Sequence, residues 1–279
     1  MLAPHLSRRP LGREVSSAEG GAPDAAPSDA PADADAATLA DVVASDGSDG
    51  GSRAEAYARE VVADAPIAYY RLEEPSGLVA KDERGAFDGV YTGSPVLGAT
   101  GVAGSRAVTM PEGIVARVEI DAPALRFVNR QAFTIELWAK PGPNLGDYQW
   151  IASTEAGNPR KGWSIFSSPT AYVFYEVWDV VDGGSNIVRA IYPTRTKITS
   201  GRFYHIAFTY DGTTLVFYLD GAQERAQAEG GNVPNVNEVV LGCRGAATSC
   251  LSGWTLDEVA FYDKSLPAAR IKAHYDAGK

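Results

Sequence analysis

From residue 66 onward the chain is a succession of short strand-like segments separated by turns, and this pattern constrains the fold more than any other feature. The clearest segments are FTIELWAK (133–140), AYVFYEVWD (171–179), YHIAFTY (204–210), LVFYLD (215–220) and WTLDEVAFY (254–262). Asp-Gly dipeptides at 211–212 and 220–221 separate neighbouring segments, as in antiparallel hairpins. About 12–14 strands are too many for a minimal immunoglobulin sandwich, so we expect an all-β jelly roll of two packed antiparallel sheets. One short C-terminal helix is expected at residues 265–275.

The first part of the chain has a different composition. Residues 14–52 consist almost wholly of Ala, Asp, Pro, Ser and Gly and contain no aromatic residue. Such a segment cannot bury enough apolar area to offset the entropy of ordering it, so we predict disorder. Residues 53–62 can form a short helix, but two turns alone are marginal in water. We therefore divide the chain into a disordered acidic tail, residues 1–64, and a domain, residues 65–279.

The charge distribution excludes some classes of function. Residues 1–64 contain 12 acidic and 5 basic side chains, whereas residues 65–279 contain 23 and 20, so the domain is nearly neutral. A basic footprint for nucleic acid is missing, and no run of about 18 apolar residues could form a transmembrane segment. The N-terminus shows no signal peptide. An acidic tether before a β-domain still favours a secreted or cell-surface protein, with an export signal upstream of a misassigned start; a cytoplasmic protein is the alternative.

Four segments carry a family resemblance. They are AYYRLEEPSGLVAKDERGAFDGVYTG (68–93), ALRFVNRQAFTIELWAKP (124–141), RFYHIAFTYDGTTLVFYLDG (202–221) and LSGWTLDEVAFYDKSLPAARIKAHY (251–275). In this order they resemble the laminin-G-like, concanavalin A-like lectin/glucanase jelly-roll domains, over about residues 66–276. The resemblance implies the fold but not the ligand, because this fold hosts lectins, lyases, hydrolases and adhesion modules.

Residues for catalysis are not evident. The jelly-roll glucanases that this fold resembles carry E-x-D-x-x-E on one strand, which supplies a nucleophile and an acid/base. The nearest match here begins at Glu119 and has Ala124 where the second catalytic glutamate should stand. Glu136 has no carboxylate at the alternate positions after it, and His205 is the one histidine in a strand, where we expect a structural imidazole. We therefore expect no enzyme.

The resemblance also implies a metal site. Members of the family often hold a structural calcium beside the first and last strands, and Glu74, Asp82 and Asp257 are the matching acids. The alternative is that Asp82 closes a turn and that Asp257 makes a buried hydrogen bond or ion pair. No EF-hand motif supports the metal.

Aromatic side chains give the clue to a ligand. Alternation along residues 171–179 places Tyr172, Glu176 and Trp178 on one face of a strand and an aliphatic set on the other. Sugars stack on tyrosine and tryptophan, so we predict a ligand site from these three residues together with Tyr148 and Trp150. The alternative is that long loops, 142–149 and 179–186, cover this face. Three further tryptophans are expected in the core: Trp138, Trp163 and Trp254.

Cys243 and Cys250 lie in a Gly/Ala/Ser loop between two expected strands, where their Cα atoms can approach within disulfide range. We predict a disulfide, which favours an oxidising compartment. Together these features predict a non-catalytic binding module for a glycan or cell-surface glycoconjugate. A structural or protein-adhesion module without a small ligand is the alternative, and a polysaccharide hydrolase or lyase a remote one.

Overall fold

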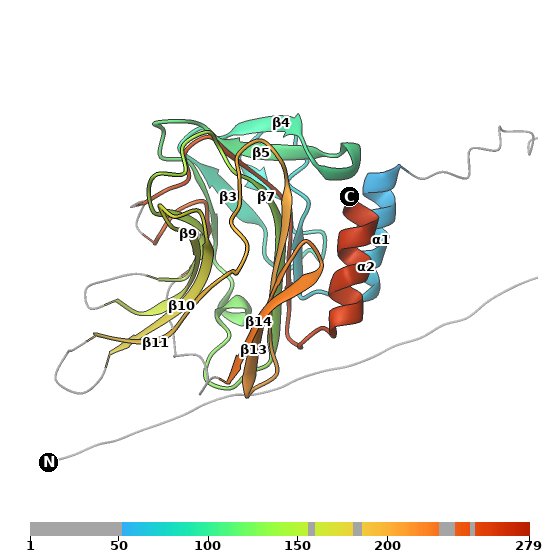
Figure 1. Ribbon diagram of the computed structural model, residues 1–279. Coiled ribbons are helices and arrows are strands. Elements are labelled where there is room, and N and C mark those ends of the chain that lie inside the picture. The colour runs from blue at the N-terminus through green and yellow to red at the C-terminus, as the bar shows by residue number, and fades with distance from the viewer. Residues whose placement is uncertain (1–51, 156–159, 181–185, 229–237, 246–248) are drawn as a thin grey trace, which may run out of the picture. The chain divides into compact units, whose positions relative to one another are not determined.

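Two antiparallel sheets of eight strands each form the sandwich in the computed structural model (Figure 1). Sheet A has the order β14 (Ala222–Ala228), β13 (Thr214–Leu219), β12 (Tyr204–Tyr210), β7 (Phe133–Lys140), β16 (Trp254–Tyr262), β5 (Arg106–Met110), β4 (Val96–Thr100), and β1 (Ala68–Tyr70) also pairs with β16. Sheet B has the order β11 (Asn186–Pro193), β10 (Val173–Val180), β9 (Gly162–Ser167), β8 (Gln149–Ser153), β15 (Val239–Leu241), β6 (Arg117–Ile120), β3 (Gly89–Thr92), β2 (Val79–Ala80). The expected all-β jelly roll is confirmed.

The structure describes residues 52–155, 160–180, 186–228, 238–245 and 249–279. The predicted disorder of residues 1–51 therefore lies outside the described residues. Within the described part of the chain, no helix is long and apolar enough to cross a lipid bilayer.

The core lies between the two sheets and follows from the alternation of side chains along the strands. Phe133, Ile135 and Leu137 of β7 face sheet B, and Trp163 and Trp254 are buried in the same cluster. The alternate residues of β7, such as Trp138, face the other way, toward a second buried cluster on the outside of sheet A. All three framework tryptophans are thus buried, as the sequence predicts.

Two α-helices, α1 (Arg53–Ala63) and α2 (Ala268–Gly278), pack side by side over the outer face of sheet A (Figure 1). Tyr57 and Val61 of α1 are fully buried in the cluster that contains Trp138. The expected boundary between residues 64 and 65 is therefore wrong, because it falls inside the folded unit. A helix of 11 residues is marginal alone, but this helix is held by tertiary burial and by the ion pairs that Arg270 of α2 makes with Glu60 and Asp64.

The C-terminal helix is present, but it begins and ends three residues later than expected. Pro267, and not Ser265, occupies its N-cap position, and no side chain caps it. Its last residue, Gly278, lies so close to the indole of Trp138 that a Cβ atom would stand 2.5 Å from the ring. Absence of a side chain at this position lets α2 dock closely on sheet A.

Candidate functional site

The outer face of sheet B carries two parallel rows of side chains that cross three strands. Strand register places Trp150 of β8 opposite Phe166 of β9, and Phe166 opposite Phe174 of β10. Ser164 of β9 likewise stands between Ser153 of β8 and Glu176 of β10. An aromatic row therefore lies beside a polar row, on the face that points away from the core.

The rings of the aromatic row stack on one another. The ring centroids of Trp150 and Phe166 are 4.9 Å apart at an interplanar angle of 19°, and those of Phe166 and Phe174 are 5.1 Å apart at 10°. Because these spacings match the distance between strands, the rings turn their faces to each other and leave their edges toward solvent. Tyr148 is tilted against this row, with centroids 6.3 Å from Trp150 and 6.0 Å from Phe166, and 51% of it is exposed.

The polar row ends at Arg160, whose guanidinium is bound by two carboxylates. One terminal nitrogen of Arg160 donates to Glu176 at 2.8 Å and to Glu155 at 2.6 Å, and its Nε donates to Glu155 as well. The guanidinium also lies over the ring of Trp178, 3.7 Å from the ring centroid. Ser164 donates to Glu155 at 2.8 Å. The guanidinium thus joins two nearly fully buried carboxylates beside the aromatic row.

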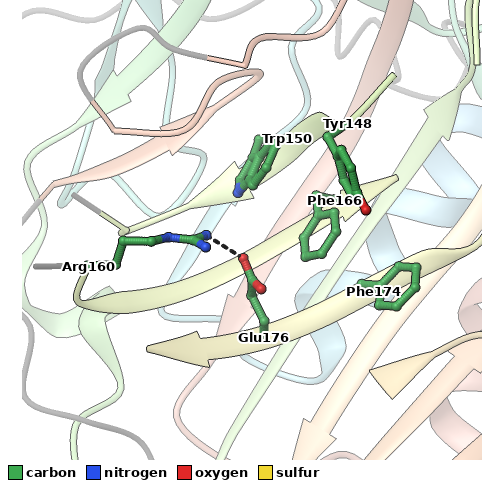
Figure 2. A pocket seen from close by; sticks show the side chains of 6 residues that line it. All are labelled: Tyr148, Trp150, Arg160, Phe166, Phe174 and Glu176. Carbon is green, nitrogen blue, oxygen red and sulfur yellow. Dashed lines mark hydrogen bonds and ion pairs between the residues drawn. The ribbon is translucent and has the colours of Figure 1, made fainter. Parts of the chain in front are cut away.

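A cavity of about 330 Å³ opens between the two rows, as Figure 2 shows. Its lining consists of Tyr148, Trp150, Arg160, Phe166, Phe174 and Glu176. The indole nitrogen of Trp150 lies on the side of Arg160 and Glu176 (Figure 2), and it is buried without a hydrogen-bond partner among the described residues. A buried N–H without an acceptor is unfavourable, so a ligand oxygen at this position would satisfy it.

The electrostatics of this cavity centre on Glu176. Burial is the main cause that raises the pKa of Glu176, and the charge of Glu155 acts in the same direction. Trp178 and Arg160 act in the opposite direction, and the resulting pKa is about 7. At neutral pH the carboxyl group of Glu176 is therefore shared between a neutral form, which donates a hydrogen bond, and an ionised form, which accepts one.

The structure brings together three of the five predicted ligand residues, Tyr148, Trp150 and Glu176. Trp178 lies outside the cavity lining and instead holds Arg160, and Tyr172 lines a neighbouring cavity. Sequence reasoning missed Arg160 and Phe166. Phe166 had a detectable signal, since it alternates with Ile165 along β9, whereas nothing in the sequence marks an arginine outside the strands as part of a site.

The three predicted calcium ligands are each engaged by protein donors. The carboxylate of Asp82 accepts four backbone N–H groups, from Tyr69, Arg84, Ala86 and Phe87. Glu74 accepts from Tyr91 and Lys81, and Asp257 accepts from the backbone of residue 102 and the hydroxyl of residue 105. No group of three or more His, Cys, Asp or Glu side chains is placed for a metal among the described residues. The structure therefore does not bring these acids together, and Asp82 closes a turn.

A second buried polar cluster lies on the outer face of sheet A, under the two helices. Glu136 of β7 accepts from Tyr262 at 2.5 Å and bonds to His274 of α2 at 2.9 Å and His205 of β12 at 3.2 Å. The Nε2 atom of His274 lies 3.0 Å from a carboxylate oxygen of Asp64. The structural role expected for His205 agrees with this arrangement. Glu136 stands without a neighbouring carboxylate in the sequence, but in the structure it is surrounded by polar partners. Full burial separates this cluster from any substrate, so we assign it to docking of the helices.

The predicted disulfide is confirmed. Cys243 and Cys250 are bonded, with Cα atoms 3.9 Å apart. Their loop lies beside the cavity, because the carbonyl of Ser249 accepts from the backbone N–H of Trp150 and the guanidinium of Arg244 lies 5.3 Å from the Trp150 ring centroid.

Comparisons with known proteins place the fold. The family model described as the concanavalin A-like lectin/glucanases superfamily matches residues 115–272. No curated protein sequence matches significantly. Similar solved structures include the binding domain of botulinum neurotoxin serotype D (11% identity, TM-score 0.58) and the binding domain of Paraclostridial mosquitocidal protein 1 (15% identity, TM-score 0.58). Each alignment covers 76% of this chain and 52% of the other, so this chain matches only about half of either domain, and the likeness shows the fold alone.

Proposed function

This chain belongs to the concanavalin A-like lectin/glucanase superfamily, and from that premise we propose that it is a non-catalytic binding module whose ligand is a glycan. One observation carries the proposal. The cavity on the outer face of sheet B combines four aromatic rings with a buried, unpartnered indole N–H and a carboxyl group. Apolar surface with a few convergent polar groups is typical of small-ligand sites.

The geometry indicates how a sugar would bind. Tyr148 is exposed and tilted, so its ring offers a face on which the apolar side of a pyranose can stack. Stacking on Trp150 is excluded on the side that Phe166 occupies. The Trp150 N–H and Glu176 would then bind sugar oxygens at the other end of the cavity. Such a shallow site supports weak affinity, roughly micromolar to millimolar.

A glycan array probed with the full chain tests the proposal, followed by titration of the best-bound glycan against two variants. Tyr148→Ala removes the stacking face and is expected to weaken binding at least about tenfold, or about 1.4 kcal/mol. Leu78→Ala is the matched control, because Leu78 is 70% exposed and lies at the β2 end of sheet B. Equal affinity of the two variants, or an array without any bound glycan, would contradict the proposal.

One observation favours the alternative of glycan cleavage. Glu176 and Glu155 both contact Arg160, and a pair of neighbouring carboxyl groups is the usual acid and nucleophile of glycosidases. Against it, both are almost fully buried, and Arg160 neutralises the group that would have to attack. Release of new reducing ends from polysaccharides by the protein, abolished by Glu176→Gln, would establish the alternative.

The proposed address is the cell surface or the extracellular space, and the proposed partner is a cell-surface glycoconjugate. The disulfide supports this address, because such bonds persist in oxidising compartments. The protein-adhesion alternative is favoured by exposed apolar side chains on β2 and β3, Val79 and Val90, which are each 49% exposed. Free thiols at both cysteines in protein isolated from its native host would remove the support for an extracellular address.

A further inference from the structure

A second cavity adjoins the first and shares Phe174 with it. It has a volume of about 390 Å³ and is lined by Tyr172, Phe174, Pro193, Thr194, Arg195 and Arg225. Pro193 of β11 stands opposite Phe174 of β10 in the strand register. The second cavity therefore begins where the aromatic row ends, one strand nearer to the edge of sheet B.

The second cavity is basic in an acidic protein. Its lining contains Arg195 and Arg225 and no acidic side chain, whereas the whole chain has a net charge of −10 and Arg160 of the first cavity is already paired with Glu155 and Glu176. Lys197 adds a further positive charge, 5.3 Å from the ring centroid of Tyr172. This local excess of positive charge would attract an anionic ligand and hold it against the bulk charge of the protein.

Each cavity also contains a buried donor that is not satisfied. The Nε1 atom of Trp150, a residue only 6% exposed, belongs to the first cavity. The Nε atom of Arg225 belongs to a residue that lines the second, and it too is buried without a partner among the described residues. Both groups can only donate hydrogen bonds, so a ligand group that binds either of them must present an acceptor such as an oxygen atom.

The aromatic row adds to the same preference. Stacking across β8, β9 and β10 uses the ring faces, so the cavity meets ring edges. Ring edges carry the positive part of the aromatic quadrupole and attract oxygen atoms, whereas ring faces attract cations. A cationic ligand group in the cavity would therefore lie beside arginines and ring edges, and not beside ring faces. This arrangement disfavours binding of a cation.

We propose that the two cavities are subsites of one groove and that its ligand is a sugar chain bearing acidic groups, with an acidic group beside Arg225 and Arg195 and the neighbouring sugar beside Trp150. This inference rests on the proposed function and narrows its ligand class. Phe174 is the wall between the subsites, so the chain passes over it from one cavity to the other. Carboxylate and sulfate groups share the required chemistry, since both present oxygens to arginine.

The test measures dissociation constants of the full chain for three oligosaccharides of equal length: a galactose hexamer, a galacturonate hexamer and a sulfated galactose hexamer. We expect an acidic hexamer to bind at least about tenfold more tightly than the neutral one, and the advantage to decline between about 50 and 500 mM NaCl because salt screens the arginines. Whether the galacturonate or the sulfated chain binds more tightly identifies the anionic group.

Two variants assign the effect to the groove. Arg225→Gln should reduce binding of the preferred acidic hexamer about tenfold and leave the neutral hexamer unchanged. Trp150→Phe keeps a ring in the row and removes only the N–H, so it should weaken the acidic hexamer several-fold. Arg59→Gln, an exposed arginine of α1 on the outer face of sheet A, is the control and should change nothing.

The outcomes separate the inference from the function on which it rests. Equal affinity for neutral and acidic hexamers, or an acidic preference that survives Arg225→Gln, overturns the inference and leaves glycan binding intact. No measurable binding of any hexamer overturns the inference, and an array without any bound glycan overturns the proposed function as well. Melting curves of Arg225→Gln and Trp150→Phe establish that both variants are folded before their affinities are compared.

Discussion

Each outer face of the sandwich contains a buried glutamate, and the surroundings of the two glutamates differ. Glu136 on sheet A and Glu176 on sheet B are both nearly inaccessible to solvent. Two helices cover Glu136, and its partners are Tyr262, His205 and His274. Glu176 lines a cavity and has Arg160 as its ion-pair partner, which it shares with Glu155. The outer face of sheet A is therefore a completed interface, because the helices cover Glu136. The outer face of sheet B is an incomplete interface, because a cavity remains open beside Glu176.

The pKa values express this difference. Burial by itself raises the pKa of Glu136, but the charge of His274 and hydrogen bonds from His205 and His274 outweigh it, so the pKa lies well below its usual range. For Glu176 burial dominates, the neighbouring Glu155 adds to it, and the pKa rises to about 7. A buried carboxyl group whose burial is fully compensated stays ionised, whereas one whose burial is only partly compensated has a raised pKa, which is typical of functional sites.

Deletion of residues 1–64 is the strongest test of the statement that sheet A has a completed interface. Tyr57 and Val61 are fully buried, at about 2–3 kcal/mol each, and their loss also exposes the Glu136 cluster. We expect unfolding free energy to fall by at least about 5 kcal/mol, measured by denaturant titration. Deletion of residues 1–51 alone is the control, and the composition of that segment predicts no change. An equal stability of the two truncated proteins would mean that α1 contributes nothing.

Glu136→Gln tests the compensation directly. The substitution leaves His205 without an anionic partner in a buried site and leaves His274 with Asp64 alone, so we expect a loss of about 3–5 kcal/mol. Glu119→Gln on β6 is the matched control, because its ion pair with Arg117 is partly exposed and contributes less than about 1 kcal/mol. A loss at Glu136 no larger than at Glu119 would show that the cluster is dispensable.

At alkaline pH the substitution Glu176→Gln should change the unfolding free energy in the opposite direction, toward greater stability. An acid whose folded pKa is raised destabilises the fold as pH rises from its unfolded pKa, about 4.5, to its folded pKa, about 7. The variant lacks this penalty, so its stability relative to the native protein should increase by about 2–3 kcal/mol between pH 5 and pH 8. Denaturant titrations at both pH values measure the difference. A difference that does not depend on pH would show that Glu176 titrates normally.

The sequence predicted the contrast between the faces only in part. Alternation along β10 correctly placed Glu176 with the aromatic side chains and away from the core, because strand period is a local property. His205, expected to be a structural imidazole, is buried beside Glu136. Four segments in family order sufficed for the architecture, since members of one family share a fold.

The remaining features depend on contacts between segments distant in the chain. Helix α1 is unremarkable in composition, and only docking against Trp138 and Arg270 makes it stable. The position of Arg160 follows from Glu155, which comes after β8, and from Glu176 and Trp178 of β10, so it depends on the pairing of neighbouring strands. No local sequence pattern encodes such contacts between segments. The correct start of the folded domain and the full lining of the cavity therefore could not be predicted from the sequence.

Calcium should have the smallest effect, and it tests whether the buried acids of β16, an interior strand of sheet A, also have all their partners within the protein. The calcium expected from the sequence needs an ionised Asp257, but burial raises the pKa of Asp257 and raises that of the adjacent Glu258 well above its usual range. Two neighbouring buried acids that retain protons are poor ligands for a hard cation. We therefore expect the melting temperature to change by less than about 1 °C between millimolar calcium and chelator. A bound calcium at about 100 times its dissociation constant would add about 2.7 kcal/mol, or about 5–10 °C in a domain of this size. A shift of that size, abolished by Asp257→Asn but retained in Glu119→Gln, would establish a metal site that the acids form only when calcium is present.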